Sequence, residues 1–214
     1  DFEFNRWDET NCDMNANEYV RGAYQSGKWA FVSDYFRLKA LYEQGGVYLD
    51  TDVELLRPFG DLLELSGFAG FEDAEHVATC VLGAEKEHGF FRQAMELYEG
   101  RTFLREGGEP DLTTNVEILT GLLGRNGLEP DGARQSVMGM EIFPAEYFSP
   151  RSLETGKLTK TGNTYAIHWF EASWQTGSQR FHRKVAQVIG KKNTERLKKL
   201  LGRSGGPESS GRSG

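Results

Sequence analysis

The hydrophobic and polar positions predict helices and strands that alternate along the chain. Apolar residues recur at helical spacing over residues 18–25, 29–44, 90–99 and 112–123. Short apolar runs bounded by glycine, proline or charged residues predict strands over residues 2–7, 47–56, 67–71, 79–83, 136–143 and 165–169. Because strands and helices interleave, the sequence predicts an α/β domain in which helices flank a central sheet.

The C-terminal part of the chain has a different character. Helices that are basic on one side are predicted over residues 181–189 and 194–201, and a Gly- and Ser-rich stretch over 202–214 is expected to be disordered. We therefore expect a single domain over 1–201, followed by a disordered tail. A solvated basic face is the simpler explanation of the last helix, and peripheral contact with an anionic membrane surface is the alternative.

Composition excludes several classes of protein. A hydrophobic fraction of 38% is that of a folded globular chain, and a net charge of −7 argues against a nucleic-acid binder. Cys12 and Cys80 have neither the spacing of a zinc site nor the number needed for a disulfide framework. A reducing compartment is the simpler interpretation, so we expect a cytoplasmic protein.

The strongest chemical signal is Asp50-Thr51-Asp52, which follows a glycine pair and a short apolar strand. Side chains two apart in an extended segment point to the same side, so Asp50 and Asp52 are expected to converge while Thr51 points away. Two convergent carboxylates suit a hard dication such as Mg²⁺ or Mn²⁺. A D-x-D triplet alone is a weak signal, and its context is what strengthens the prediction of a metal and diphosphate site.

The predicted helix over 29–44 carries a charged pair on its inner side. At 100° per residue, Asp34 falls inside the apolar arc and Arg37 lies at its margin. One interpretation is an internal Asp34–Arg37 ion pair. The other is that Asp34 faces a ligand and that Arg37 orients it or the neighbouring carboxylates, because a buried acid is otherwise unfavourable.

Two enzyme families have a D-x-D motif after a short apolar strand. The run 47–53 resembles the first motif of haloacid-dehalogenase-type phosphatases, in which the first Asp is a nucleophile and the second an acid/base beside Mg²⁺. That class also needs a later acidic pair for the metal. The aspartates after Asp52 do not form such a pair; they are Asp61, Asp73, Asp111 and Asp131.

The second resemblance is more extensive. The run 29–37 (WAFVSDYFR) followed by 41–52 (LYEQGGVYLDTD) resembles the sugar-binding region of DXD-containing glycosyltransferases, in particular glycosyltransferase family 32. A later run, 165–169 (YAIHW) followed by Ser173 and Trp174, is similar to the closing I-H-x-x-x-x-S-W element of that family. The family also has a first strand and helix that this sequence lacks, so we expect the domain to be N-terminally incomplete.

The resemblance implies a GT-A fold, in which a Rossmann-like nucleotide-binding sheet flanked by helices forms a single domain. Asp50 and Asp52 would hold Mn²⁺ or Mg²⁺ against the donor diphosphate, and His168 would be a third ligand. A core histidine is the alternative for His168. The donor-binding residues that the resemblance implies are Ala30, Asp34, Arg37, Asp50, Thr51, Asp52, Ser173 and Trp174.

Roles within that set follow the resemblance. Ser173 and Trp174 would contact the phosphates, with a place in the core as the alternative for Trp174. Ala30 and Asp34 would border the nucleoside and the donor sugar. Tyr48 is expected to pack rather than take part in the chemistry.

The function implied is retaining sugar transfer from a UDP- or GDP-sugar to a glycan or lipid-linked acceptor, as in capsular polysaccharide biosynthesis. No catalytic base is assigned. We expect acceptor loops around 107–114 and 147–151, and a cytoplasmic location that includes the inner face of the membrane. An inactive nucleotide- or sugar-binding remnant is a further alternative, because the first strand of the family is missing.

Overall fold

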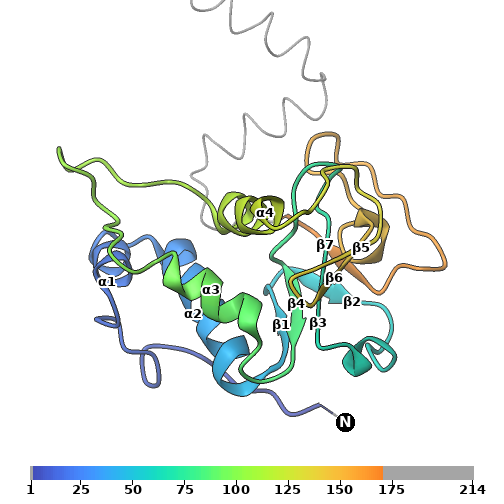
Figure 1. Cartoon of the computed structure of the whole chain (residues 1–214), viewed down its shortest axis with the longest axis horizontal. Helices are drawn as coiled ribbons and strands as arrows, with labels where there is room; N and C mark the ends of the chain where they lie inside the picture. The colour runs from blue at the N-terminus through green and yellow to red at the C-terminus, as the bar shows by residue number, and fades with distance from the viewer. Residues whose placement is uncertain (1, 171–214) are drawn as a thin grey trace, which may run out of the picture. The chain divides into compact units, whose positions relative to one another are not determined.

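The computed structural model describes residues 2–170, and the compact unit formed by residues 2–151 and 158–170 is considered below (Figure 1). The helices predicted over 181–189 and 194–201, the tail and the residues Ser173 and Trp174 lie outside the described residues. Among the described residues, no helix has the length and hydrophobicity needed to span a bilayer.

Four α-helices form where the apolar periodicity predicts them. They are α1 (Glu18–Gln25), α2 (Trp29–Gln44), α3 (Gly89–Glu96) and α4 (Asn115–Arg125). The Asn17 side chain caps α1 by accepting a hydrogen bond from the Val20 amide, and Thr114 and Glu117 form a capping box on α4. Gly45 ends α2 with φ 70° and ψ −161°, a conformation that is almost restricted to glycine and that differs from the left-handed helical conformation common at helix ends.

Five strands form a mixed sheet in the order β1-β4-β3-β6-β5. Their bounds are β1 Gly46–Leu49, β4 Val81–Ala84, β3 Gly67–Gly70, β6 Met140–Phe143 and β5 Gln135–Val137. A separate antiparallel ribbon pairs β2 (Val53–Leu55) with β7 (Ala166–His168), and two short 3₁₀ turns are η1 (Leu62–Glu64) and η2 (Ala145–Tyr147). Among the described strands only β3 and β6 are parallel neighbours.

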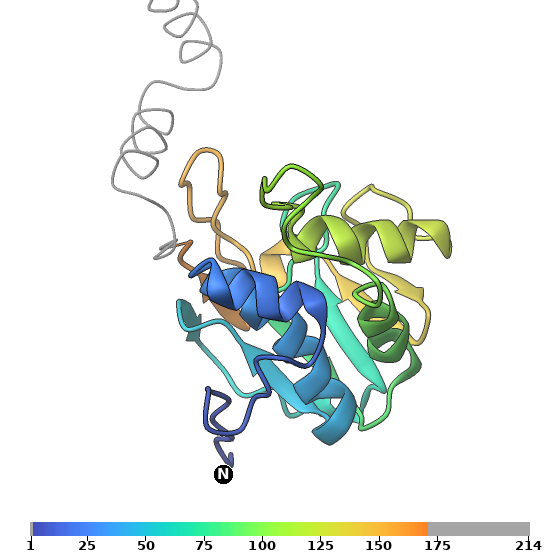
Figure 2. The ribbon, with the colours of Figure 1, turned by 90° about the vertical axis from the view of Figure 1, so that its left-hand side faces the viewer.

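The two faces of the sheet bury separate hydrophobic clusters. The helices cover one face (Figure 2), where residues such as Leu38, Leu82 and Ile142 pack together. The other face is covered by the aromatic rings of Phe59, Phe148 and Tyr165. This mixed α/β arrangement confirms the predicted fold class and is consistent with a GT-A-like fold.

Strand direction decides where chemistry can gather. β1 and β3 are both antiparallel to β4, so they run in the same direction, and β6 is parallel to β3. The carboxyl ends of β1, β3 and β6 therefore lie at one edge of the sheet, which we call the carboxyl edge. Asp50 follows β1 at this edge, and its amide donates to Cys80 O at the start of β4 (2.9 Å).

Two local predictions are wrong. Residues 2–7 form no strand, and Phe4 is 91% exposed. An alternating apolar pattern is not enough for a strand, because a strand needs a neighbouring strand to pair with, and the described residues provide none here. Residues 50–52 are not extended but form a turn between β1 and β2, closed by the Val53 amide donating to Asp50 O (3.1 Å).

Close packing across the sheet predicts a stability difference between two Gly→Ala substitutions. A Cβ at Gly83 would lie 2.1 Å from Cε1 of the buried Phe68, whereas one at Gly124 in α4 meets nothing within 4 Å. Gly83→Ala should lower the free energy of unfolding by about 1–3 kcal/mol. Gly124→Ala should raise it by up to about 1 kcal/mol, because glycine is unfavourable in a helix.

Urea denaturation of both variants measures this difference. If Gly83→Ala is as stable as the wild type, the close contact between Gly83 of β4 and the Phe68 ring is contradicted.

Candidate functional site

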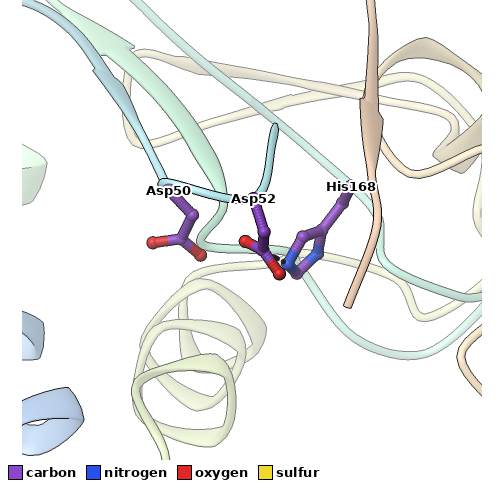
Figure 3. Close-up of side chains that lie close together, drawn as sticks. All are labelled: Asp50, Asp52 and His168. Carbon is purple, nitrogen blue, oxygen red and sulfur yellow. Dashed lines mark ion pairs between the residues drawn. The ribbon is translucent and has the colours of Figure 1, made fainter. Parts of the chain in front are cut away.

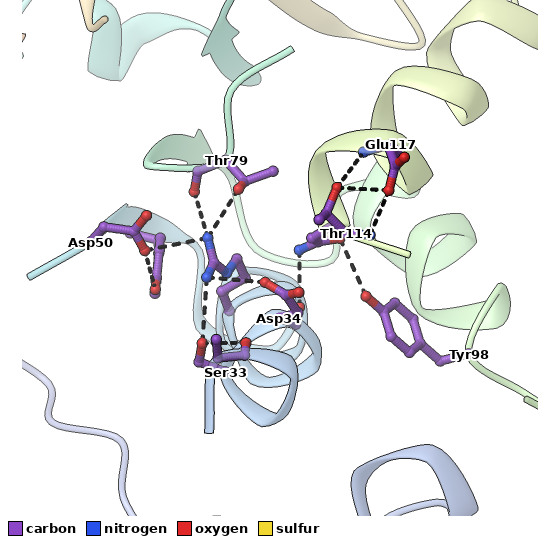
Figure 4. Close-up of polar contacts among 11 residues, drawn as sticks. Ser33, Asp34, Asp50, Thr79, Tyr98, Thr114 and Glu117 are labelled. Atoms are coloured by element: carbon purple, nitrogen blue, oxygen red, sulfur yellow. Dashed lines mark hydrogen bonds and ion pairs between the residues drawn. The ribbon is translucent and has the colours of Figure 1, made fainter. Parts of the chain in front are cut away.

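The charged pair of α2 is buried and joined as the sequence suggested. Arg37 Nη2 lies 3.1 Å from Asp34 Oδ1, and the two residues are 7% and 9% exposed. Nδ2 of the Asn115 side chain, at the start of α4, donates to Asp34 O (3.1 Å), and Tyr98 OH donates to Asn115 Oδ1 (3.3 Å). The first of these hydrogen bonds joins α4 to α2, and the second joins α4 to the segment just after α3 (Figure 4).

Arg37 also reaches the sheet, so the internal ion pair is only part of its role. Its Nη1 donates to Thr79 O (2.9 Å) and Thr79 Oγ1 (3.1 Å) and lies 3.3 Å from Asp50 Oδ1. Its guanidinium carbon lies 4.7 Å from the centre of the Tyr48 ring. Burial lowers the pKa of Arg37, but Tyr48, Asp34 and Asp50 raise it more, so Arg37 stays charged.

Burial has the opposite effect on its partner. It raises the pKa of Asp34 to about 6, with Arg37 opposing the shift and Asp50 adding to it. Arg37 thus lies between two carboxylates in a site that solvent barely reaches.

Asp50 is held through one of its two carboxylate oxygens. Tyr48 OH donates to Asp50 Oδ1 (2.8 Å), the same oxygen that faces Arg37 Nη1, and neither contact involves Oδ2. Alternation along β1 explains this arrangement, since Tyr48 packs with the helix-side cluster whereas Val47 and Leu49 pack on the other face. The hydrogen bond raises the pKa of Tyr48, although burial contributes most to that rise.

His168 completes the group from the far end of the chain. It ends β7, where it pairs with Val53, the residue after Asp52. Its Nε2 lies 3.3 Å from Asp52 Oδ1, and its Nδ1 is buried with no hydrogen-bond partner in the described part of the chain. Burial lowers the pKa of His168 despite the opposing effect of Asp52, which favours the neutral imidazole that can bind a metal.

The three side chains fit a divalent cation. Asp50, Asp52 and His168 each offer one ligand atom, and these atoms lie within 4.8 Å of one another (Figure 3). Two carboxylate oxygens and one imidazole nitrogen are a donor set suited to Mn²⁺, and less so to Mg²⁺. The carboxylates of Asp34, Asp50 and Asp52 outnumber the single guanidinium, so a dication would also offset the excess negative charge.

Among the described residues, the others predicted to bind the donor or the acceptor make no contact that indicates such a role. Ala30 is half-buried in the first turn of α2, and Thr51 is exposed at the turn after β1. The predicted acceptor loop 107–114 precedes α4, and the segment 147–151 follows β6 at the carboxyl edge. Ser173 and Trp174 stay predictions.

Sequence reasoning missed Tyr48 and Thr79 as polar contacts of the site. Tyr48 stands two residues before Asp50, so strand alternation alone could have placed its hydroxyl on the same side. No sequence signal points to Thr79, because its contact with Arg37 joins residues 42 positions apart through the fold.

Residues 5–69 match the family described as "Glycosyltransferase sugar-binding region containing DXD motif". The matched stretch includes α1, α2, β1 and the DXD turn. It supports glycosyl transfer with a divalent metal as the general activity of this region, in preference to the phosphatase alternative. No curated protein and no solved structure matches the chain.

The raised pKa of Asp34 predicts a pH-dependent difference in stability. A carboxyl with a pKa of about 6 in the folded chain and about 4 when unfolded contributes stability that is present below pH 4 and lost as pH rises through 6. Relative to Asp34→Asn, the wild type should therefore lose about 2–3 kcal/mol between pH 4 and pH 7. Urea denaturation in EDTA at several pH values measures this.

Asp13→Asn is the matched control. Asp13 is exposed and accepts a hydrogen bond from the Asn15 amide that an asparagine can also accept. It shows the effect of an Asp→Asn change at an exposed position. A difference between Asp34→Asn and the wild type that stays constant between pH 4 and pH 7 would contradict the raised pKa of Asp34.

The shared oxygen of Asp50 predicts a second effect. Tyr48→Phe should weaken Mn²⁺ binding by roughly 10- to 100-fold, because partners that orient a metal ligand typically contribute that much to affinity. Titration calorimetry with Mn²⁺ alone measures it. Tyr24→Phe is the control, because the Tyr24 hydroxyl makes no hydrogen bond with the described residues. Its affinity for Mn²⁺ should equal that of the wild type. Equal affinities in Tyr48→Phe and the wild type would show that the hydroxyl does not hold Asp50 for the metal.

Proposed function

We propose that this chain is a retaining glycosyltransferase that moves a hexose from a UDP- or GDP-sugar to a hydroxyl of a glycan or lipid-linked acceptor. The observation that carries the proposal is the group Asp50, Asp52 and His168, whose ligand atoms lie within 4.8 Å of one another. It lies beside the buried Asp34–Arg37 pair in a region that matches DXD-containing glycosyltransferases.

Asp50, Asp52 and His168 would hold Mn²⁺, or Mg²⁺, against the donor diphosphate. The bound dication offsets the negative charge that grows on the leaving nucleoside diphosphate. The protein's part is to orient its ligands, and Tyr48 OH and Arg37 do this for Asp50 by contacting its Oδ1. The imidazole of His168 favours Mn²⁺ over Mg²⁺.

The donor sugar would lie next to α2. Asp34 can accept hydrogen bonds from sugar hydroxyls, and Arg37 keeps it beside Asp50. Ala30 would border the nucleoside, and Thr51, Ser173 and Trp174 would contact the donor from the DXD turn and the segment after β7. Transfer would follow front-face attack by the acceptor hydroxyl as the diphosphate leaves, with positioning as a main source of rate.

The biological setting is proposed with the activity. A cytoplasmic enzyme in polysaccharide biosynthesis, in peripheral contact with the inner face of the membrane, would meet both a nucleotide sugar and a lipid-linked saccharide. That contact would involve the basic C-terminal segment.

Asp50→Asn and Asp52→Asn test the proposal. Each substitution should lower Mn²⁺-dependent hydrolysis of a UDP- or GDP-sugar at least 100-fold, because each removes a charged ligand of the metal. A screen of nucleotide sugars by thermal shift with Mn²⁺ selects the donor, and release of the nucleoside diphosphate is then measured.

Glu85→Gln is the control, because Glu85 follows β4 at the opposite edge of the sheet from Asp50. It should hydrolyse the donor like the wild type. Nucleotide binding without any turnover in the wild type would instead favour a binding module, and unchanged turnover in Asp50→Asn with Asp52→Asn would exclude this site.

A further inference from the structure

A second acid, Glu72, stands at the carboxyl edge of the sheet. β3 ends at Gly70, Phe71 bridges to Val77, and the Glu72 amide donates to His76 O (2.7 Å), so Glu72 opens the loop that leads towards β4. Since β1 and β3 run in the same direction on either side of β4, Glu72 and Asp50 share this edge. Two interstrand spacings separate the ends of β1 and β3 by roughly 10 Å.

The surroundings of Glu72 do not stabilise its charge. The residue is half-buried, and its carboxylate makes no hydrogen bond or ion pair with the described residues. The titratable groups that face it are Asp73 and His76 in its own loop, Asp50 after β1 and Cys80 at the start of β4. Burial raises the pKa of Glu72 to about 7, Asp73 and Asp50 add to the rise, and His76 opposes it.

Its neighbour shows what a structural acid looks like in the same loop. Asp73 Oδ1 accepts hydrogen bonds from the Glu75 and His76 amides, both at 2.8 Å, and its pKa is lowered by these contacts although burial acts the other way. Asp73 therefore builds the loop. The Glu72 side chain makes no such contact with the described residues, and an acid without a structural partner at the carboxyl edge of the sheet is a candidate for ligand binding.

We propose that Glu72 is an acceptor-binding residue, whose carboxylate accepts a hydrogen bond from a hydroxyl of the saccharide acceptor. This proposal rests on the function proposed above. A carboxylate repels an anionic diphosphate, so Glu72 suits sugar hydroxyls and not the phosphates, and because Asp34 would face the donor sugar, Glu72 is assigned to the acceptor. The roughly 10 Å between the ends of β1 and β3 leaves space for a sugar ring along this edge, between the metal site and the loop that carries Glu72.

The segment after β6 borders the same place. Phe71 N donates to Phe143 O (2.8 Å), and Ser149 Oγ lies 3.6 Å from Cys80 Sγ. The acceptor loop predicted over 147–151 thus lies beside the strands that carry Glu72 and Asp50. Glu72, an acid without a described partner, and the predicted acceptor loop 147–151 therefore lie at the same carboxyl edge of the sheet.

Glu72→Gln separates acceptor binding from donor chemistry. The donor selected with Mn²⁺ is incubated with a panel of methyl glycosides of glucose, galactose and mannose, and hydrolysis to free sugar is measured beside transfer to the glycoside. Glu72→Gln should keep donor hydrolysis within about two-fold of the wild type. The KM for the glycoside should rise roughly 10- to 100-fold, the usual effect of losing a hydrogen bond to a charged group.

The pH dependence gives a readout that a merely structural role would not change. In the wild type the glycoside KM should rise as pH falls from 8 to 6, because protonation removes the carboxylate. In Glu72→Gln the KM for the glycoside should vary much less with pH, with titration of Asp34 as the remaining contribution. Glu75→Gln, an exposed position in the same loop, should behave like the wild type.

The outcomes distinguish this proposal from the one it rests on. If the wild type does not hydrolyse or transfer any donor sugar, the glycosyltransferase proposal fails and Glu72 has no acceptor to bind. If hydrolysis persists but no glycoside is glycosylated, or if the wild type and Glu72→Gln use the glycoside equally well, the assignment of Glu72 alone is overturned.

Discussion

The site depends on one buried cation shared by two carboxylates. The guanidinium of Arg37 contacts Asp34 on its own helix and Asp50 at the end of β1, and it donates to Thr79 at the approach to β4. Without it, Asp34 and Asp50 would lose the cation that they share, and burial would favour the neutral form of Asp34 still more. Arg37 therefore fixes α2 against the carboxyl edge and keeps Asp50 in place for a metal.

Strand direction supplies the rest of the geometry. The DXD turn leaves the main sheet at the end of β1 and at once enters β2, whose partner β7 returns from the far end of the chain. This pairing sets His168 opposite Val53 and so beside Asp52. A three-residue strand pair thus joins a late histidine to an early acidic turn, and its register decides whether the third ligand is present.

Much of this could be predicted from the sequence, and the exceptions have physical reasons. Helical periodicity gave the bounds of α2 and placed Asp34 and Arg37 on its inner side. It could not show that Arg37 also pairs with Asp50, because that contact depends on how helix and sheet pack. The convergence of Asp50 and Asp52 was expected from an extended strand, yet a turn produces it. His168 was expected only from a family resemblance, since no local pattern reveals a strand pair that spans most of the chain.

The carboxyl edge that carries this site also holds two acids whose charged forms burial disfavours. Burial raises the pKa of both Asp34 and Glu72, so each acid destabilises the folded chain once it is ionised near neutral pH. Asp34 is partly explained by its ion pair with Arg37, whereas packing gives no reason to keep an acid at position 72, because an amide there would avoid the desolvation. A ligand does give a reason: sugar hydroxyls can donate to a carboxylate, and a nearby dication offsets the charge of the whole edge. The two acids come from different elements near Asp50, one from α2 and one from the loop after β3. That arrangement suits two hydroxyl-bearing substrates that meet at one metal-bound diphosphate.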